Sequence, residues 1–294
     1  MLSIAFGVAD VALVYLVALR LFGRASIAMI SALLLLFTPA HAMFSRTASG
    51  EGIWPIPFVL IWAASLASFA ENRTPSSRWL LAVGSAALML AAVLQPTAVI
   101  LVVVFGAVTL ATAYLAGRLS LHDLWPAGLT AAALALPIAW RSLVVGPDGS
   151  FARWMILRAD IRSPLVVSQA LSRFWEFFQL SHLFLNPEGP AFAGLFLAGM
   201  CVPLALGMYA LFRNTEHQSS RGRLIVAAGC VAGPLTAALC GPPTVDARAI
   251  SILPFGALLA GYGSVVGWRS RLGRAAILAS TCGMLAQLWW LWHR

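Results

Sequence analysis

Long apolar runs, separated by short polar breaks that often hold Gly or Pro, recur from one end of the 294-residue sequence to the other. Each run is about 20 residues long, the length of helix that crosses the apolar part of a bilayer. Strand-length alternation of apolar and polar residues is not seen. The chain is therefore predicted to be all-α, a polytopic helical membrane protein with a single transmembrane domain over 1–294. About ten spans are expected, near 2–20, 25–40, 54–70, 79–94, 97–116, 124–144, 191–211, 223–240, 249–267 and 274–292.

Composition agrees with this prediction. Hydrophobic residues make up 61% of the chain and charged residues 10%, and the mean hydropathy is +0.88. A soluble domain carries about a quarter charged residues. The net charge is +9, and all nineteen basic residues are Arg. In a soluble protein such an excess would favour nucleic-acid binding, but here the arginines lie mostly in short loops, so we expect them to set the membrane orientation and expect no nucleic-acid partner.

The short loops that hold arginines alternate with the other connections along the chain. Short cytoplasmic loops of membrane proteins are rich in Lys and Arg. This rule places in the cytoplasm the connections holding Arg20, Arg24, Arg73, Arg78, Arg118, Arg213, Arg221, Arg223, Arg269, Arg271 and Arg274. It places on the outer face both termini, the 37–53 loop, the Gln95-Pro96 turn, the 145–190 segment and the 241–248 loop.

The long outer segment, about 145–190, is predicted to contain a helix of its own. Ser163 and Pro164 form a typical helix start, an N-cap followed by proline at the first helical position. Leu171, Trp175 and Phe178 then follow helical spacing, with polar residues on the other face. Two interpretations stay open: an amphipathic helix lying in the outer membrane interface, or a loop helix packed on the bundle.

The first outer loop combines a cation and an acid five residues apart, Arg46 and Glu51. Glu51 is the best candidate for a catalytic residue, because a carboxylate there could act as general base toward an acceptor hydroxyl or bind a metal ion. Arg46 could hold a phosphate through its planar guanidinium. The alternative is an ordinary hairpin turn, in which the two side chains are solvated or form an exposed salt bridge that contributes little.

Other polar residues are predicted to face the same side. His182, Asp246 and Arg248 precede later spans on the outer face, and with Arg46 and Glu51 they would suit an anionic lipid-linked substrate. Asp10 lies inside the first span, where an acid either serves function or hydrogen-bonds to a neighbouring helix; we slightly favour the second role. The four cysteines lie singly in apolar runs, so they indicate no metal site.

The stretch YLVALRLFGRASIAMISALLLLFTPAHAMFSRTASGEG resembles the GT-C superfamily of integral-membrane glycosyltransferases, in the bacterial branch around the protein mannosyltransferases and the aminoarabinose transferase. The later stretches FWEFFQLSHLFLNPEGP, GLFLAGMCVPLALGMYALFRN and GPLTAALCGPPTVDARAISILPFGALLAGYG also resemble the family, in its order. Residues of the first stretch that fit the family pattern are Tyr15, Arg20, Phe22, Gly23, Pro39, His41, Ser45, Arg46, Ala48 and Glu51.

The resemblance implies transfer of a sugar, with inversion, from a polyprenyl-phosphate carrier to an acceptor on the outer face of a bacterial cytoplasmic (inner) membrane. By the family pattern, Glu51 matches the second acidic position, and Arg248 matches an arginine that could contact the carrier phosphate. The lipid-linked sugar is then the donor. The resemblance leaves open whether a divalent metal is needed.

The sequence also departs from the family pattern. It begins at what resembles the second span, so we expect the first span, the first outer loop with the principal acid, and the soluble C-terminal domain to be missing. Two hypotheses follow. The chain is a glycosyltransferase that is whole only if it is extended upstream or completed by a partner, or it is a non-catalytic membrane subunit that kept a GT-C-derived scaffold and binds lipid or a larger membrane complex. A transporter is less favoured, because no inverted repeat is visible.

Overall fold

The computed structural model describes residues 2–46, 53–71, 74–94, 98–115, 120–145, 164–184, 194–213, 220–239 and 250–293. Within these residues the regular structure is helical throughout, which confirms the predicted fold class. A helix occupies the position of each predicted span. These helices are α1 (Leu2–Phe22), α2 (Ala25–Leu36), α4 (Ile56–Glu71), α5 (Pro75–Leu94), α6 (Ala98–Leu115), α7 (Trp125–Val145), α11 (Cys201–Phe212), α12 (Ser220–Leu239), α14 (Leu253–Gly267) and α15 (Arg271–Trp292).

Shorter helices connect or extend them. They are α3 (Pro39–Arg46), α9 (Pro164–Glu176), α10 (Leu180–Phe184) and the 3-10 turns η1 (Leu121–Leu124), η4 (Ala198–Met200) and η6 (Ile250–Ile252). By length and composition, five helices in the described part of the chain are fit to cross a membrane alone, or six if the bent pair of α2 and α3 counts as one span.

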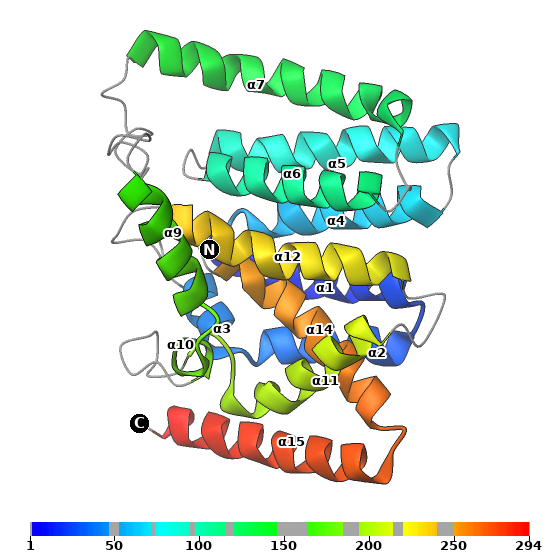
Figure 1. Cartoon of the computed structure of the whole chain (residues 1–294), viewed down its shortest axis with the longest axis vertical. Coiled ribbons are helices and arrows are strands. Elements are labelled where there is room, and N and C mark those ends of the chain that lie inside the picture. Colours follow the sequence, from blue (N-terminus) through cyan, green and yellow to red (C-terminus); the bar gives the residue numbers. More distant parts are fainter. Residues whose placement is uncertain are drawn as a thin grey trace.

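The long helices lie side by side in a stack, with α7 at one edge and α15 at the other (Figure 1). The inner helix is the late span 250–267, of which 89% is buried, whereas only 11% of the apolar window of α15 is buried. A helix that is apolar all round and buried inside a bundle needs no polar face. The stack therefore has its core around α14, and α15 is a peripheral helix that would face lipid.

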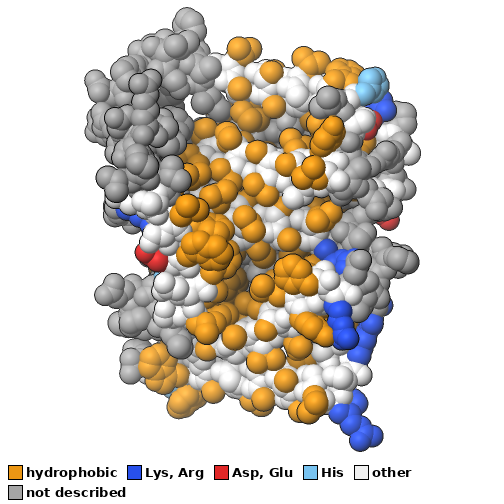
Figure 2. All heavy atoms as spheres, in the orientation of Figure 1, with side chains coloured by type: hydrophobic (Ala, Val, Ile, Leu, Met, Phe, Trp, Pro, Cys, Tyr) orange, Lys and Arg blue, Asp and Glu red, His pale blue; other side chains and the backbone are white. Residues whose placement is uncertain are grey.

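Basic side chains gather at one end of the stack, to the right in Figure 2, while apolar side chains cover its middle. Both described chain ends lie at the opposite, left end (Figure 1). We call the first the basic end. Its exposed arginines include Arg20, Arg24, Arg213, Arg269, Arg271 and Arg274. This segregation agrees with the alternation of loops read from the sequence; which end faces the cytoplasm stays a prediction.

The basic end begins with the tight connection from α1 to α2. Gly23 adopts φ +64°, and its N–H donates to the Leu19 carbonyl over 2.9 Å. A left-handed residue just past the last helical turn is the usual helix stop, and glycine adopts it without a Cβ clash. The first helix therefore ends near the predicted position, Arg20, because Gly23 adopts this left-handed conformation.

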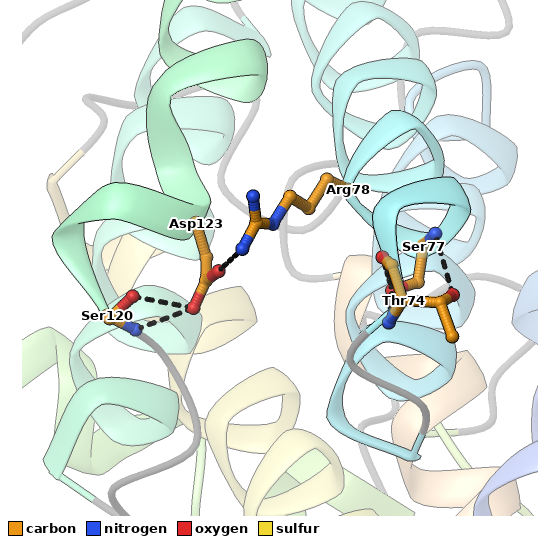
Figure 3. A network of polar contacts seen from close by, with 5 residues as sticks. All are labelled: Thr74, Ser77, Arg78, Ser120 and Asp123. Carbon is orange, nitrogen blue, oxygen red and sulfur yellow. Dashed lines mark hydrogen bonds and ion pairs between the residues drawn. The ribbon is translucent and has the colours of Figure 1, made fainter.

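A second polar network at the basic end joins α5 to the start of α7 (Figure 3). Arg78 lies 3.0 Å from the Asp123 carboxylate, which also accepts hydrogen bonds from the Ser120 N–H and hydroxyl. Thr74 and Ser77 form a reciprocal cap on α5. The acid Asp123 therefore serves to anchor helix ends, as capping groups do.

The predicted helix after Ser163-Pro164 is present as α9, which contacts α12. Its apolar side chains point away from the protein: Leu171 is 54% exposed and Trp175 65% exposed. Arg173, on the polar face, is half-buried. An exposed apolar stripe on a helix at the end of a membrane bundle suits contact with lipid. The arrangement favours the interfacial alternative while retaining some packing on the bundle.

Candidate functional site opposite the basic end

The second predicted span, 25–40, stops at Leu36, and the chain bends by 60° into α3. Proline disfavours a helical conformation at the residue before it, and it suits the first position of a new helix. Pro39 therefore ends one helix and starts the next. The Thr38 hydroxyl donates to the Leu34 carbonyl over 2.6 Å, while the Thr38 carbonyl accepts from the Ala42 N–H over 3.1 Å. The first eight residues after the break are thus helical, where a simple hairpin was one alternative.

Helix α3 lies directly on the first turns of α1. A Cβ placed on Gly7 would come within 2.6 Å of the Ser45 Cβ and 3.7 Å of the His41 ring, so a bare backbone is needed at this crossing. Small residues let helices approach closely in a membrane, where packing drives association. The contact aligns α3 along α1 and places His41 near Asp10.

Asp10 and His41 form a buried pair inside the bundle. His41 Nε2 lies 3.6 Å from Asp10 Oδ2, with the two residues 3% and 0% exposed. Neither carboxylate oxygen of Asp10, nor His41 Nε2, has a hydrogen-bond partner among the described residues. Ionisable groups in a membrane interior are costly and usually face a partner or a functional path. The sequence analysis considered Asp10 without a partner. The feature that could have indicated His41 is its place in the Pro-x-His pattern of the family.

The residues that follow the 47–52 segment in the chain also contact the first turns of α1. The Trp54 indole N–H donates to the Ser3 hydroxyl over 3.3 Å, and the Phe6 ring lies 6.5 Å from Trp54 and 5.9 Å from Phe58, centroid to centroid. Ile53 is fully buried. The two described flanks of the loop, α3 and the Ile53–Trp54 turn, therefore both rest on the start of α1. Glu51 itself lies outside the described residues, so its catalytic role stays a prediction.

The other predicted site residues are placed only in part. Arg46 is exposed at the end of α3, and His182 is half-buried on α10, where its ring meets the edge of Phe177 at 4.9 Å. Helices α3, α9 and α10 lie toward the same end of the stack (Figure 1). Asp246 and Arg248 lie outside the described residues. Within the part of the chain that the structure describes, no three His, Cys, Asp or Glu side chains gather as a metal site would require.

Arg173 is a candidate that the sequence reading missed. It sits on α9, and its Nη1 atom is buried without a hydrogen-bond partner in the described part of the chain. A guanidinium that keeps unused donors in a shielded place can bind a phosphate strongly. Helical spacing had placed Arg173 on the polar face but carried no information on its burial.

Neither a scan against protein-family models nor a search of curated proteins finds a match. Solved structures do. The crystal structure of ArnT from Cupriavidus metallidurans in the apo state matches with a TM-score of 0.58 and 18% identity, over 97% of this chain and 49% of that chain. ArnT from the same organism bound to undecaprenyl phosphate matches with a TM-score of 0.52 and 18% identity, over 97% of this chain and 50% of that chain.

This chain therefore spans about half the length of the ArnT structures that it matches. At this level of identity the likeness concerns the fold. The sequence motifs resemble the GT-C superfamily, and the helices are arranged as in the ArnT structures, so the two observations agree on the fold. The protein has the GT-C-like fold of integral-membrane glycosyltransferases.

Proposed function

We propose that this protein binds a polyprenyl-phosphate-linked sugar at the end of the bundle opposite the basic end and transfers the sugar to an acceptor hydroxyl. The observation that carries the proposal is the fold shared with ArnT, which has been crystallised with undecaprenyl phosphate. The exposed Arg46 at the end of α3 supports the proposal, because an anionic lipid headgroup needs cations.

The chemistry assigned to the site is an inverting substitution. Glu51 removes the proton from the acceptor hydroxyl, the oxygen attacks the anomeric carbon, and the bond from that carbon to the phosphate oxygen breaks. The polyprenyl phosphate leaves with its negative charge, which Arg46 and Arg248 stabilise. His182 and Asp246 are assigned to binding of the sugar and acceptor.

The buried pair of Asp10 and His41 supports this assignment indirectly. It joins α1 to α3, and α3 ends at Arg46, the first residue of the proposed site. Residues held by packing keep a binding group in place better than a free loop does. We therefore assign Asp10 and His41 to positioning Arg46, not to contact with the substrate.

The test begins with binding. Native mass spectrometry of the purified protein with added undecaprenyl phosphate should show a one-to-one adduct. Arg46→Ala and Arg248→Ala should each weaken this adduct by about tenfold, the loss expected when one charged hydrogen-bonding partner of a phosphate is removed. The control is Arg213→Ala, an exposed arginine at the basic end.

Transfer is tested in the same preparation. Glu51→Gln should abolish sugar transfer from a polyprenyl-phosphate-linked donor while the adduct persists. Glu71→Gln, the same change at an exposed position at the end of α4, should leave transfer unchanged. Transfer that survives Glu51→Gln would remove Glu51 from its role. An adduct without any transfer by the unaltered protein would favour the alternative, a lipid-binding subunit on a GT-C-derived scaffold.

A further inference from the structure

The structure contains an apolar groove that runs along α2. It lies between α2, α14 and α15 and has a volume of about 760 Å³. Helix α15 is held at η4, where the Ser280 hydroxyl donates to the Gly199 carbonyl and the Ala198 N–H donates to the Gln287 side chain over 2.7 Å. It also contacts α11 and α14, and the groove lies along its inner face, toward α2.

The two ends of the groove differ in chemistry. Ser26, Trp268 and Arg269 line it at the basic end, whereas Phe37, Leu197 and Leu288 line the other end. No Asp or Glu belongs to the described lining. A serine hydroxyl, an indole and a guanidinium at the mouth of an apolar channel resemble the interfacial groups that meet lipid headgroups. The groove is therefore suited to a molecule with an anionic head and an apolar tail.

Further positive charge surrounds this mouth. Arg24 precedes Ser26 by two residues, and Arg271 and Arg274 lie in the first turn of α15; all three are exposed, as is Arg269 (Figure 2 shows the basic side chains of this end). Clustered arginines next to a membrane attract anionic lipids, by about 1 kcal/mol for each cation near the surface, or about fivefold in binding. The charge at the mouth thus selects for phosphate.

The length of the groove fits one leaflet of a bilayer. Its lining extends along α2 from Ser26 to Phe37 and along α15 from Ile277 to Leu288. At 1.5 Å per residue each stretch is about 16 Å long, close to half of the roughly 30 Å hydrocarbon core. A lipid whose head lies at the basic end would therefore end its tail near the middle of the membrane.

From these observations we infer that the groove between α2, α14 and α15 is a binding site for an anionic phospholipid of the leaflet at the basic end, with its phosphate at Arg269 and one acyl chain between α2 and α15. This site is separate from the proposed donor site, because a polyprenyl phosphate bound from the outer face would place its phosphate at the apolar end. There the described lining offers Phe37, Leu197 and Leu288 and no cation. The inference does not depend on the proposed function.

The experiment uses the full chain in native mass spectrometry, with phosphatidylglycerol or phosphatidylcholine added to the detergent-purified protein. We expect a phosphatidylglycerol adduct that outcompetes phosphatidylcholine. Arg269→Ala should weaken it about fivefold, the share of one interfacial arginine. Arg213→Ala, an exposed arginine of the same end that does not line the groove, is the matched control.

A second pair of variants tests the channel itself and guards against misfolding. Leu285→Trp places a bulky ring in the groove and should abolish the adduct. Leu278→Trp adds the same ring at another exposed position of α15 that is not part of the lining. Unfolding temperatures matched to the parent protein establish that both variants fold.

An adduct that Arg269→Ala and Leu285→Trp both leave unchanged would overturn the inference, and so would equal binding of the two phospholipids. If Leu285→Trp instead removed an undecaprenyl phosphate adduct and spared phosphatidylglycerol, the groove would belong to the sugar carrier and the phospholipid assignment would be wrong. Failure of Glu51→Gln to affect sugar transfer would bear on the proposed function alone.

Discussion

At the scale of single residues, the unusual feature is an acid and a histidine buried together in a membrane bundle. Asp10 and His41 come from α1 and α3, and His41 Nε2 lies 3.6 Å from Asp10 Oδ2. Within the described residues neither this nitrogen nor either carboxylate oxygen of Asp10 has a hydrogen-bond partner. A lone buried charge is very costly, so such a pair remains only if its members depend on one another.

This dependence is testable by a double-mutant cycle. His41→Ala leaves the buried acid without its neighbour and should lower the free energy of unfolding by about 1–3 kcal/mol. In an Asp10→Asn background, His41→Ala should lower the free energy of unfolding by a smaller amount, and the two losses should differ by more than about 0.5 kcal/mol. The reason is that no acid then remains buried without a neighbour. Unfolding of the purified protein in mixed micelles by added denaturing detergent measures both values.

The control for this cycle is Ser31→Ala. Ser31 is fully buried in α2, and its hydroxyl has no hydrogen-bond partner in the described part of the chain, so its removal should leave stability nearly unchanged. An equal cost of His41→Ala in the two backgrounds would show that the two side chains do not interact.

At the scale of elements, the close crossing of α1 and α3 determines where the first outer loop begins. Two devices produce it: Pro39 redirects the chain after α2, and Gly7 lets α3 approach α1. Both are ordinary sequence features, but only their combination brings the end of α3 onto the first turns of α1. The position of Arg46 depends on this packing.

Two alanine substitutions separate crowding from helix propensity. Gly7→Ala should destabilise the protein and weaken undecaprenyl phosphate binding, because the new methyl group would meet Ser45 at 2.6 Å and push α3 away. Gly283→Ala, in the middle of α15 with open space around it, should instead be neutral or stabilising by up to about 1 kcal/mol, since alanine favours a helix over glycine.

Unfolding and adduct measurements on the two glycine variants provide the comparison. If Gly7→Ala behaved like Gly283→Ala, the close approach of α3 to α1 would not be needed for the site.

At the scale of the whole molecule, the segregation of charge gives the protein two different ends. Exposed arginines gather at one end, and α3, α9 and α10 lie toward the other (Figures 1 and 2). The positive-inside rule then assigns the basic end to the cytoplasm. A donor carried by a lipid on the outer face would meet α3, α9 and α10.

Single cysteines report this orientation. In a background in which Cys201, Cys230, Cys240 and Cys282 are replaced, Arg46→Cys should react with an impermeant thiol reagent in intact cells. Arg271→Cys should react only after the membrane is opened, because both positions are exposed but lie at opposite ends. The reverse pattern of labelling would invert the topology and move the proposed site to the cytoplasmic face.

Much of the fold could be predicted from the sequence. The positions of the long helices, the Gly23 turn and the start of α9 all follow from local rules of hydrophobicity, capping and backbone conformation. The predicted span 25–40 extended too far because apolar residues continue past Leu36, and hydropathy does not register the bend at Pro39. For the candidate site, the sequence named Arg46 and His182 by residue type and topology, but it could not tell that Arg173 is half-buried.

By itself, then, the sequence determined the helical membrane class and the positions of the long apolar helices, because both depend on residues close together in the chain. Only the tertiary structure decided that His41 lies beside Asp10, that Ser45 packs against Gly7, and that a groove lined by Arg269 runs along α15. These features depend on how helices far apart in sequence pack against one another. Hydrophobic periodicity places a side chain on a helix face, but the neighbour on that face is chosen by shape, and shape complementarity exists only in the assembled bundle.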